Sequence, residues 1–167
     1  MNWQQSIKSF SHYLKLEKSL SSNSVEAYCN DIKKLADFAF TSLGDKKPEK
    51  IELKDLKGFL SFLFDLGLSP NSQARIISGI KSFYSFLKYE SIIDKNPATL
   101  LEAPKIGRKL PTVLSIEEID NMIACIDMSK AEGQRNRAII ETLYSCGLRV
   151  SELINLKISD LYRNDGF

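Results

Sequence analysis

Residues 69–89 read SPNSQARIISGIKSFYSFLKY, and their apolar side chains recur three and four positions apart. That spacing places them on one face of an α-helix. Ser69 is a suitable N-cap, and Pro70 fits the first helical position, where the N–H that proline lacks is not needed. The stretch therefore predicts an amphipathic helix whose buried face consists of Ile76, Ile77, Ile80, Phe83, Tyr84 and Leu87.

The opposite face of this helix is polar and contains no acidic residue before Glu90. It combines cations with small hydroxyls: Arg75, Ser78, Lys81, Ser82 and Ser85. Short hydroxyls and long cations suit a helix that lies against phosphates and base edges. An ordinary solvated face fits the same residues equally well.

Three further helices are predicted before this one. Apolar residues at helical spacing mark residues 2–17, and a second stripe follows the serine-rich break at 19–24. After the polar loop at 44–50, a third stripe stops near Gly67. Four helices with short connections predict a compact helical domain of about one hundred residues.

A basic segment follows the four helices. Residues 101–112 read LEAPKIGRKLPT, with prolines on either side of Lys105, Arg108 and Lys109 and no apolar period. We expect an extended linker that crosses a DNA backbone, and a solvent-exposed tether is the alternative. Residues 1–112 carry 17 Lys and Arg against 12 Asp and Glu, while residues 113–167 carry 6 against 9, so the basic excess lies in the first part.

Helical patterns resume beyond the linker. Ser115 and Glu118 have the spacing of a capping box, and isoleucines follow at helical intervals. A longer helix is expected over 130–146, closed by Gly147, and then a short one with Val150, Leu153 and Ile154 inward. Residues 161–163 predict a strand and 165–166 a hairpin turn. Because that strand has no partner here, we expect the chain to be the front part of a longer protein.

The short helix lies within the sequence SCGLRVSELINL at 145–156. Arg149 and Glu152 are three residues apart, so their side chains can touch on one helical face. An arginine presents five donors in a fixed geometry that suits a phosphate. The alternative is an exposed ion pair that contributes only about 0.2–0.5 kcal/mol.

Composition excludes several classes of protein. No stretch approaches the roughly 18 uninterrupted apolar residues of a membrane span, and no signal peptide is visible. The chain has one histidine and three widely spaced cysteines, so we expect neither a metal site nor a disulfide framework. We interpret Cys29 and Cys146 as small core residues of a cytoplasmic protein.

Several segments together resemble the Xer-type tyrosine recombinases of the phage-integrase family. They are LSSNSVEAYCNDIKKLADF near the start, NPATLLEAPKIGRKLPTVLSIEEID around the linker, and RNRAIIETLYSC followed by GLRVSEL. The resemblance implies a mainly α chain: a four-helix SAM-like core-binding domain at 1–102, a basic linker at 103–113, and at 114–167 the helical start of a mixed α/β catalytic domain cut off at its first hairpin.

The resemblance also implies an activity. Such enzymes cleave and rejoin DNA through a 3′-phosphotyrosine intermediate, as in chromosome dimer resolution or element integration, without a metal or other cofactor. Arg149 matches the family's first active-site arginine, and Glu152 matches a supporting acid. The matches to DNA-facing positions are Asn23, Ser24, Lys33, Arg75, Ser78 and Lys81, to which the linker adds Lys105, Arg108 and Lys109.

The implied partners are double-stranded DNA and a second recombinase subunit on the same site, with a tetramer in the synaptic complex. None of the six tyrosines matches the family's nucleophile, so we expect this chain by itself to bind DNA without cleaving it. A non-catalytic DNA-binding module and a helical protein-interaction domain are the alternatives, and salt-dependent binding to duplex DNA separates the last from the others.

Overall fold

The computed structural model describes residues 2–105, 107 and 110–161. Within these residues it contains seven α-helices and two 3₁₀-helices and no strand, which confirms the prediction of a mainly α chain. The chain divides into two compact units, Met1–Arg108 and Lys109–Phe167, which we call unit 1 and unit 2.

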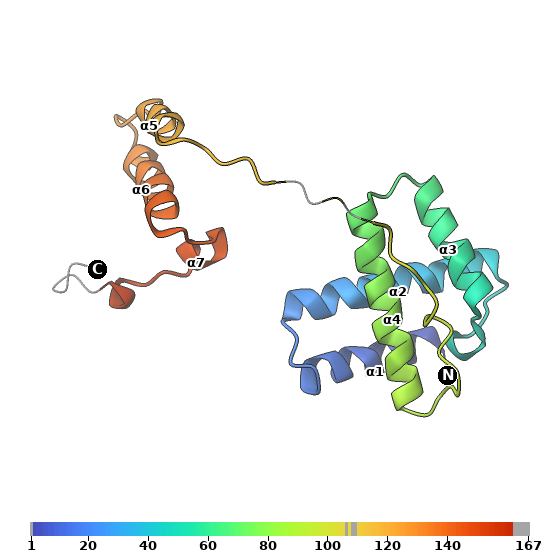
Figure 1. Cartoon of the computed structure of the whole chain (residues 1–167). Coiled ribbons are helices and arrows are strands. Elements are labelled where there is room, and N and C mark those ends of the chain that lie inside the picture. Colours follow the sequence, from blue (N-terminus) through green and yellow to red (C-terminus); the bar gives the residue numbers. More distant parts are fainter. Residues whose placement is uncertain (1, 106, 108–109, 162–167) are drawn as a thin grey trace. The chain divides into compact units, whose positions relative to one another are not determined.

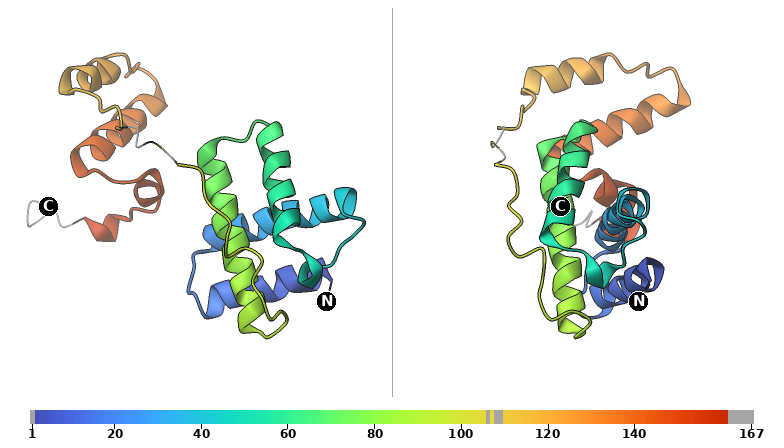
Figure 2. Two further views of the ribbon diagram at one scale, coloured as in Figure 1. Left: turned by 45° about the vertical axis from the view of Figure 1, so that its right-hand side comes forward. Right: turned by 90° about the vertical axis from the view of Figure 1, so that its right-hand side faces the viewer.

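Unit 1 contains four α-helices, and each of the four predicted helices is present. They are α1 (Trp3–Leu16), α2 (Ser22–Ser42), α3 (Leu53–Asp65) and α4 (Pro70–Tyr89), with the 3₁₀-helix η1 (Pro48–Lys50) before α3. Helices α1 and α2 run antiparallel side by side, and α4 crosses both of them (Figure 1). Helix α3 lies beside α4, as the left view in Figure 2 shows.

Local capping chemistry sets where these helices begin. The Ser72 N–H donates to the Ser69 hydroxyl at 3.3 Å, and Pro70 occupies the first turn of α4, as predicted. The Ser24 N–H donates to Ser21 in the same way at the start of α2. Each cap satisfies a backbone donor that has no partner inside its helix, which is worth about 0.5–2 kcal/mol.

The core of unit 1 is built on the apolar face of α4. All six residues predicted for that face are buried. The Phe10 ring of α1 packs edge-on against Phe83 with 5.3 Å between ring centroids and tilts against Phe86 at 5.6 Å. Burying one large apolar side chain stabilises the fold by about 1.5–3 kcal/mol, so this face of α4 organises the bundle.

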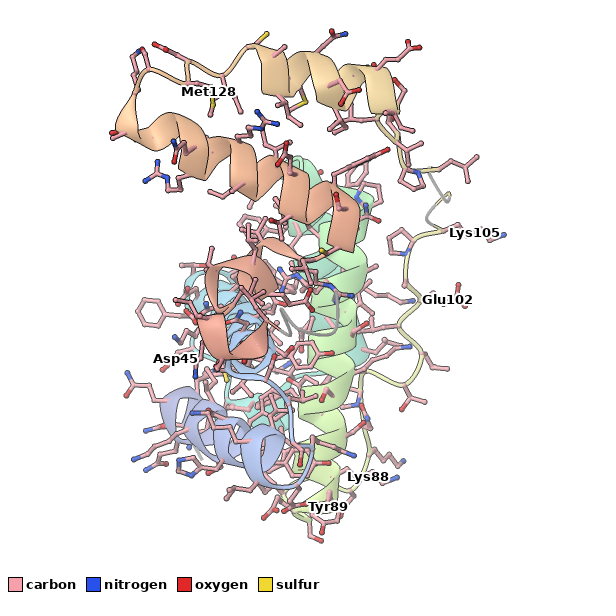
Figure 3. All side chains as sticks on the ribbon, turned by 90° about the vertical axis from the view of Figure 1, so that its left-hand side faces the viewer. Asp45, Lys88, Tyr89, Glu102, Lys105 and Met128 are labelled. Atoms are coloured by element: carbon pink, nitrogen blue, oxygen red, sulfur yellow. The ribbon has the colours of Figure 1, made fainter. Side chains whose placement is uncertain are left out.

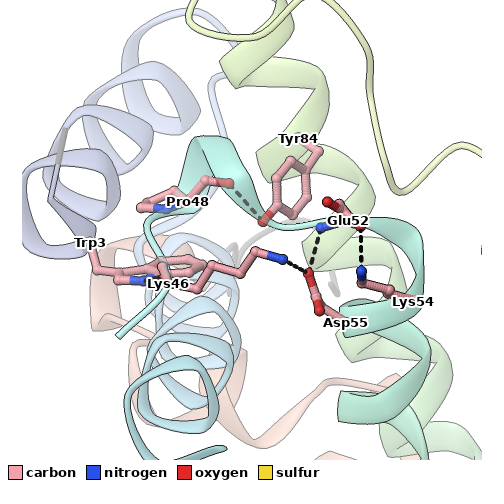
Figure 4. Close-up of polar contacts among 7 residues, drawn as sticks. All are labelled: Trp3, Lys46, Pro48, Glu52, Lys54, Asp55 and Tyr84. Atoms are coloured by element: carbon pink, nitrogen blue, oxygen red, sulfur yellow. Dashed lines mark hydrogen bonds and ion pairs between the residues drawn. The ribbon is translucent and has the colours of Figure 1, made fainter. Parts of the chain in front are cut away.

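Polar contacts fasten the loop before α3 onto the bundle (Figure 4). The Lys46 ammonium donates to Asp55 Oδ2 at 2.6 Å, and the Glu52 N–H donates to the same oxygen at 2.8 Å. The Trp3 indole N–H donates to the carbonyl of Lys46 at 3.0 Å. Burial raises the pKa of the Asp55 carboxyl, but the Lys46 and Glu52 donors outweigh it, so this pKa lies below its ordinary value.

Unit 2 contains α5 (Ile116–Ala124), α6 (Ala131–Cys146), α7 (Val150–Ile154) and the 3₁₀-helix η2 (Ile158–Asp160). The predicted capping box is confirmed: the Glu118 N–H donates to the Ser115 hydroxyl at 3.2 Å, and the Ser115 N–H donates to the Glu118 carboxylate at 2.8 Å. Gly147 closes α6 with a φ of 61°, the left-handed conformation predicted for it.

The burial predicted for unit 2 was wrong in part. Val150 is 66% exposed and Ile154 is 74% exposed, and only Leu153 of that stripe is half-buried. Three helices of 9, 16 and 5 residues are too few to enclose a core. Cys146 is likewise exposed, whereas Cys29 is buried as expected. Beyond Leu161, the expected strand and turn lie outside the described residues.

Candidate nucleic-acid interface and phosphate site

Arg149 and Glu152 meet at the start of α7. The Arg149 guanidinium donates through Nη1 to Glu152 Oε1 at 3.1 Å, and the Arg149 backbone N–H donates to Glu152 Oε2 at 2.7 Å. Arg149 is the N-cap residue of α7, with extended backbone, and it lies two residues after Gly147, which closes α6. The carboxylate therefore holds the arginine at both its backbone and its side chain.

This arrangement leaves most of the guanidinium accessible. The Arg149 side chain is 83% exposed, and its contact with Glu152 occupies one of its five N–H donors. Planar guanidinium groups bind phosphate oxygens through two parallel hydrogen bonds. The Arg149–Glu152 pair of unit 2 can therefore present a fixed, accessible cation to a phosphate.

A second group of cations lies where α2 and α4 cross in unit 1. Asp31 on α2 has a side chain that is 1% exposed, and its Oδ2 accepts a hydrogen bond from Nη1 of Arg75 on α4. The Lys34 ammonium lies 3.6 Å from the other carboxylate oxygen. Burial raises the pKa of the Asp31 carboxyl above its ordinary value, and Arg75 and Lys34 offset part of that rise.

Asp31 and Lys34 are residues that the sequence interpretation missed. Among four polar residues in five positions, Asp31 looks like part of a solvated face. Its partner Arg75 is 44 residues away, so no local spacing connects them. Helical geometry could have connected these residues with the predicted ones. Each residue turns a helix by about 100°, so Asn23, Ser24, Asp31 and Lys34 lie within about 100° of one another around α2, on one face of the helix.

The other predicted residues of α2 and α4 occupy different positions on unit 1. Asn23 is exposed in the first turn of α2, and the Ser24 hydroxyl lies 3.0 Å from that of Ser21. On α4, the Ser78 hydroxyl donates to the carbonyl of Ala74 at 3.0 Å, and Lys81 is half-buried. Ser78 lies three residues after Arg75, so these two share a helical face.

Lys33 lies on another side of α2. It is two residues from Asp31 and therefore about 200° away around the helix. There it lines a groove of about 570 Å³ between α1 and α2 together with Lys8 and Cys29, and its ammonium donates to the Asn30 side chain at 3.2 Å. The structure thus brings Lys34, not Lys33, next to Asp31 and Arg75.

The structure describes only one of the three predicted linker cations. Lys105 is exposed, and Figure 3 shows its side chain projecting from the extended segment that follows α4. Arg108 and Lys109 lie outside the described residues.

The described residues contain neither a metal-binding cluster nor a membrane-spanning helix. In residues 2–105, 107 and 110–161, no group of three or more His, Cys, Asp or Glu side chains could hold a metal ion. Over the same residues, no helix combines the length and the apolarity needed to cross a membrane.

Burial strongly raises the pKa of the Tyr84 hydroxyl, which donates to the carbonyl of Pro48 at 3.3 Å. Tyr84 is therefore a core residue and unsuited to act as a nucleophile.

Comparison with known protein families identifies both units. Residues 7–91 match the family described as phage integrase, N-terminal SAM-like domain. Residues 112–167 match the phage integrase family. The two matches follow one another in the chain, with residues 92–111 between them.

Curated relatives agree with these matches. The chain is 40% identical over 161 residues to a protein named tyrosine recombinase XerD from Oceanobacillus iheyensis, and 36% identical over 161 residues to one of the same name from Listeria innocua. A Staphylococcus aureus protein of that name is 37% identical over 161 residues. Each alignment covers 96% of this chain and 54% of the relative, so the chain spans about half the length of these proteins.

A solved structure gives the same assignment. The crystal structure of XerA recombinase matches with a TM-score of 0.50 and 26% identity, over 98% of this chain and 54% of the other. The chain therefore belongs to the phage integrase family of tyrosine recombinases, with Xer-type recombinases among its relatives.

Proposed function

We propose that the protein to which this chain belongs is a site-specific recombinase that cleaves and rejoins duplex DNA through a 3′-phosphotyrosine intermediate. The observation that carries the proposal is the Arg149–Glu152 pair: an accessible guanidinium held by a carboxylate, in a chain that aligns with XerD recombinases over 96% of its length. The alternative is a non-catalytic DNA-binding module, which would need no such residue.

Arg149 is our candidate catalytic residue because of the charge that develops during the reaction. Attack of a tyrosine hydroxyl on a phosphodiester creates a pentacoordinate transition state with additional negative charge on the non-bridging oxygens. A fixed cation directed at those oxygens stabilises them, and losing one such group costs about 2.7–4 kcal/mol in comparable sites. Glu152 supports Arg149 by holding its guanidinium in place before the DNA arrives.

Unit 1 and the linker are our candidates for DNA binding. Asn23, Ser24, Arg75 and Ser78 combine small hydroxyls, an amide and a cation on α2 and α4, the composition expected for contacts with phosphates. We add Lys34 on structural grounds and keep Lys81 and Lys33 as predictions. Lys105, Arg108 and Lys109 would follow the DNA backbone across a linker that we place at 103–113 between domains at 1–102 and 114–167.

Residues 1–167 alone would bind DNA without cleaving it. Tyr84 is buried, and none of the other five tyrosines matches the family's nucleophile. The complete enzyme would act in the cytoplasm with a second recombinase subunit on the same site and as a tetramer in synapsis. Chromosome dimer resolution, with its link to cell division, and integration of a mobile element are the two biological settings that this chemistry fits.

Suicide DNA substrates, which trap the covalent intermediate, test the proposal in the complete recombinase. We expect the wild type to form a protein–DNA adduct and Arg149→Ala to reduce its rate about 100–1000-fold. Arg137→Ala is the matched control, because Arg137 also pairs with a glutamate on an exposed helix surface, with 2.9 Å between Nε and Glu141 Oε1. Adduct formation at the normal rate by Arg149→Ala would show that Arg149 is not catalytic.

A further inference from the structure

Asp31 occupies an unusual position for a carboxylate. Aspartate is almost never fully buried unless it is paired, and the side chain of Asp31 is 1% exposed where α2 meets α4. Its Oδ2 accepts the hydrogen bond from Arg75, and its Oδ1 accepts none within the part of the chain that the structure describes. The carboxylate thus lies beneath the surface, with the cations of Arg75 and Lys34 at its edge.

Stability alone does not account for this pair. Replacing a buried ion pair by well-packed apolar residues is often neutral or stabilising, because two charges must be removed from water to form it. The adjacent α4 residue is Gly79, and a Cβ there would meet Asp31 at 3.6 Å, an ordinary contact. The helix crossing therefore has room for apolar packing, yet it holds a carboxylate.

The pair instead fixes the orientation of Arg75. A free arginine side chain has about 2 kcal/mol of rotamer entropy, part of which is lost when it binds a ligand. The Asp31 bond uses one of five N–H donors and leaves the Arg75 side chain 43% exposed. Arg75 is thus oriented before any ligand binds, which lowers the entropic cost of binding.

We propose that Asp31 is a positioning residue, which holds the Arg75 guanidinium at the surface of unit 1 so that its remaining donors contact a phosphate of duplex DNA. The inference rests on the DNA binding proposed above and assigns one phosphate contact to a defined pair of residues. Asp31 does not touch DNA itself, because its side chain is buried.

The substitution Asp31→Asn gives a test in which two explanations predict opposite changes in DNA affinity: an effect of net charge alone, and the loss of the positioning of Arg75. Removing a negative charge strengthens DNA binding if only net charge matters. If Asp31 positions Arg75, one phosphate contact is lost and binding weakens instead. The expected loss is about eightfold at 0.1 M monovalent salt, with a decrease of about 0.9 in the slope of log K against log salt.

Asp37→Asn is the matched control. Asp37 lies on the same helix and is exposed beside the α1–α2 groove, so the change in charge is the same and no contact with Arg75 is involved. We would measure binding of residues 1–167 to a 30-base-pair duplex by fluorescence anisotropy at pH 8 across a salt series, after circular dichroism has shown that each variant is folded. Asp37→Asn should bind as tightly as the wild type or more tightly.

Arg75→Lys extends the test to the case in which Asp31→Asn does not fold. It keeps the charge and the carboxylate but removes the planar group, so it should bind more weakly than the wild type, and we expect Arg75→Gln to bind more weakly still. Wild-type affinity for Asp31→Asn or for Arg75→Lys overturns the positioning role while leaving DNA binding intact. No salt-dependent binding by the wild type would instead refute the proposed function on which the inference rests.

Discussion

The contacts of Asp55 give a stability prediction whose size follows from the geometry. The carboxylate accepts from the Lys46 ammonium at 2.6 Å and from the Glu52 N–H at 2.8 Å, and its side chain is 7% exposed. Asp55→Ala removes the acceptor of both donors. A hydrogen bond to a charged group contributes about 1.5–3 kcal/mol and a helix cap about 0.5–2 kcal/mol. We therefore expect the free energy of unfolding of unit 1 to fall by about 2–5 kcal/mol.

Urea denaturation followed by tryptophan fluorescence measures this loss. Trp3 is the only tryptophan, and its indole N–H donates to the carbonyl of Lys46, in the loop that Asp55 fastens. With a urea dependence of about 2 kcal/mol per molar, the middle of the usual range, the midpoint should fall by roughly 1–2.5 M. Lys54→Ala is the control, because Lys54 pairs with Glu52 on the open surface, and it should leave the midpoint unchanged.

Acid gives an independent check on the same residue. The pKa of Asp55 is lowered in the folded state, so its contribution is complete above the ordinary pKa of about 3.9 and is lost as the pH falls through the folded value. The stability difference between wild type and Asp55→Ala should therefore narrow below about pH 4. A difference below about 1 kcal/mol at pH 7, or one that does not change with pH, would refute the reasoning.

Further predictions concern Asp31 and two glycines. The pKa of Asp31 is raised by burial, so the folded state binds its proton more tightly; wild type should gain stability relative to Asp31→Asn as the pH falls toward 4, as measured by urea denaturation. Gly79→Ala should raise the stability of unit 1 by about 0.8–1.0 kcal/mol, because a Cβ meets only ordinary contacts of 3.5–3.6 Å and alanine favours helix. Gly133→Ala should lower the helicity of unit 2 measured by circular dichroism, because its Cβ would lie 2.4 Å from the carbonyl oxygen of Asp127. An equal response of the two glycine variants would contradict this contrast.

Local patterns were enough to predict the elements of unit 1. The six apolar residues of α4, the cap at Ser69 and the proline that follows it all depend on residues within a few positions of one another. The capping box at Ser115 and the glycine that closes α6 were predictable for the same reason. Such features belong to a single helix, so a single stretch of sequence contains the information.

Burial and pairing between elements were harder to predict. Val150 and Ile154 lie on a genuine apolar stripe, but a stripe is buried only when another element packs against it. The Asp31–Arg75 pair joins two helices, and the face of α2 that meets α4 is known only once they are packed. In the candidate site, sequence predicted the contact between Arg149 and Glu152 but not the position of Lys34 beside Asp31.

The exposed apolar side chains of unit 2 have a practical consequence for anyone who prepares this chain. Val113, Leu114, Ile116, Val150, Ile154 and Ile158 are each at least half exposed, and Ile119 is the only buried large apolar side chain among the described residues of unit 2. Unit 1 has an extensive apolar core, although Leu16, Phe40 and Phe64 are exposed. Exposed apolar surface of this kind promotes self-association in concentrated samples. A preparation of residues 1–167 should therefore precipitate sooner on concentration than one that ends at residue 108, and the shorter chain is the better starting material for crystals.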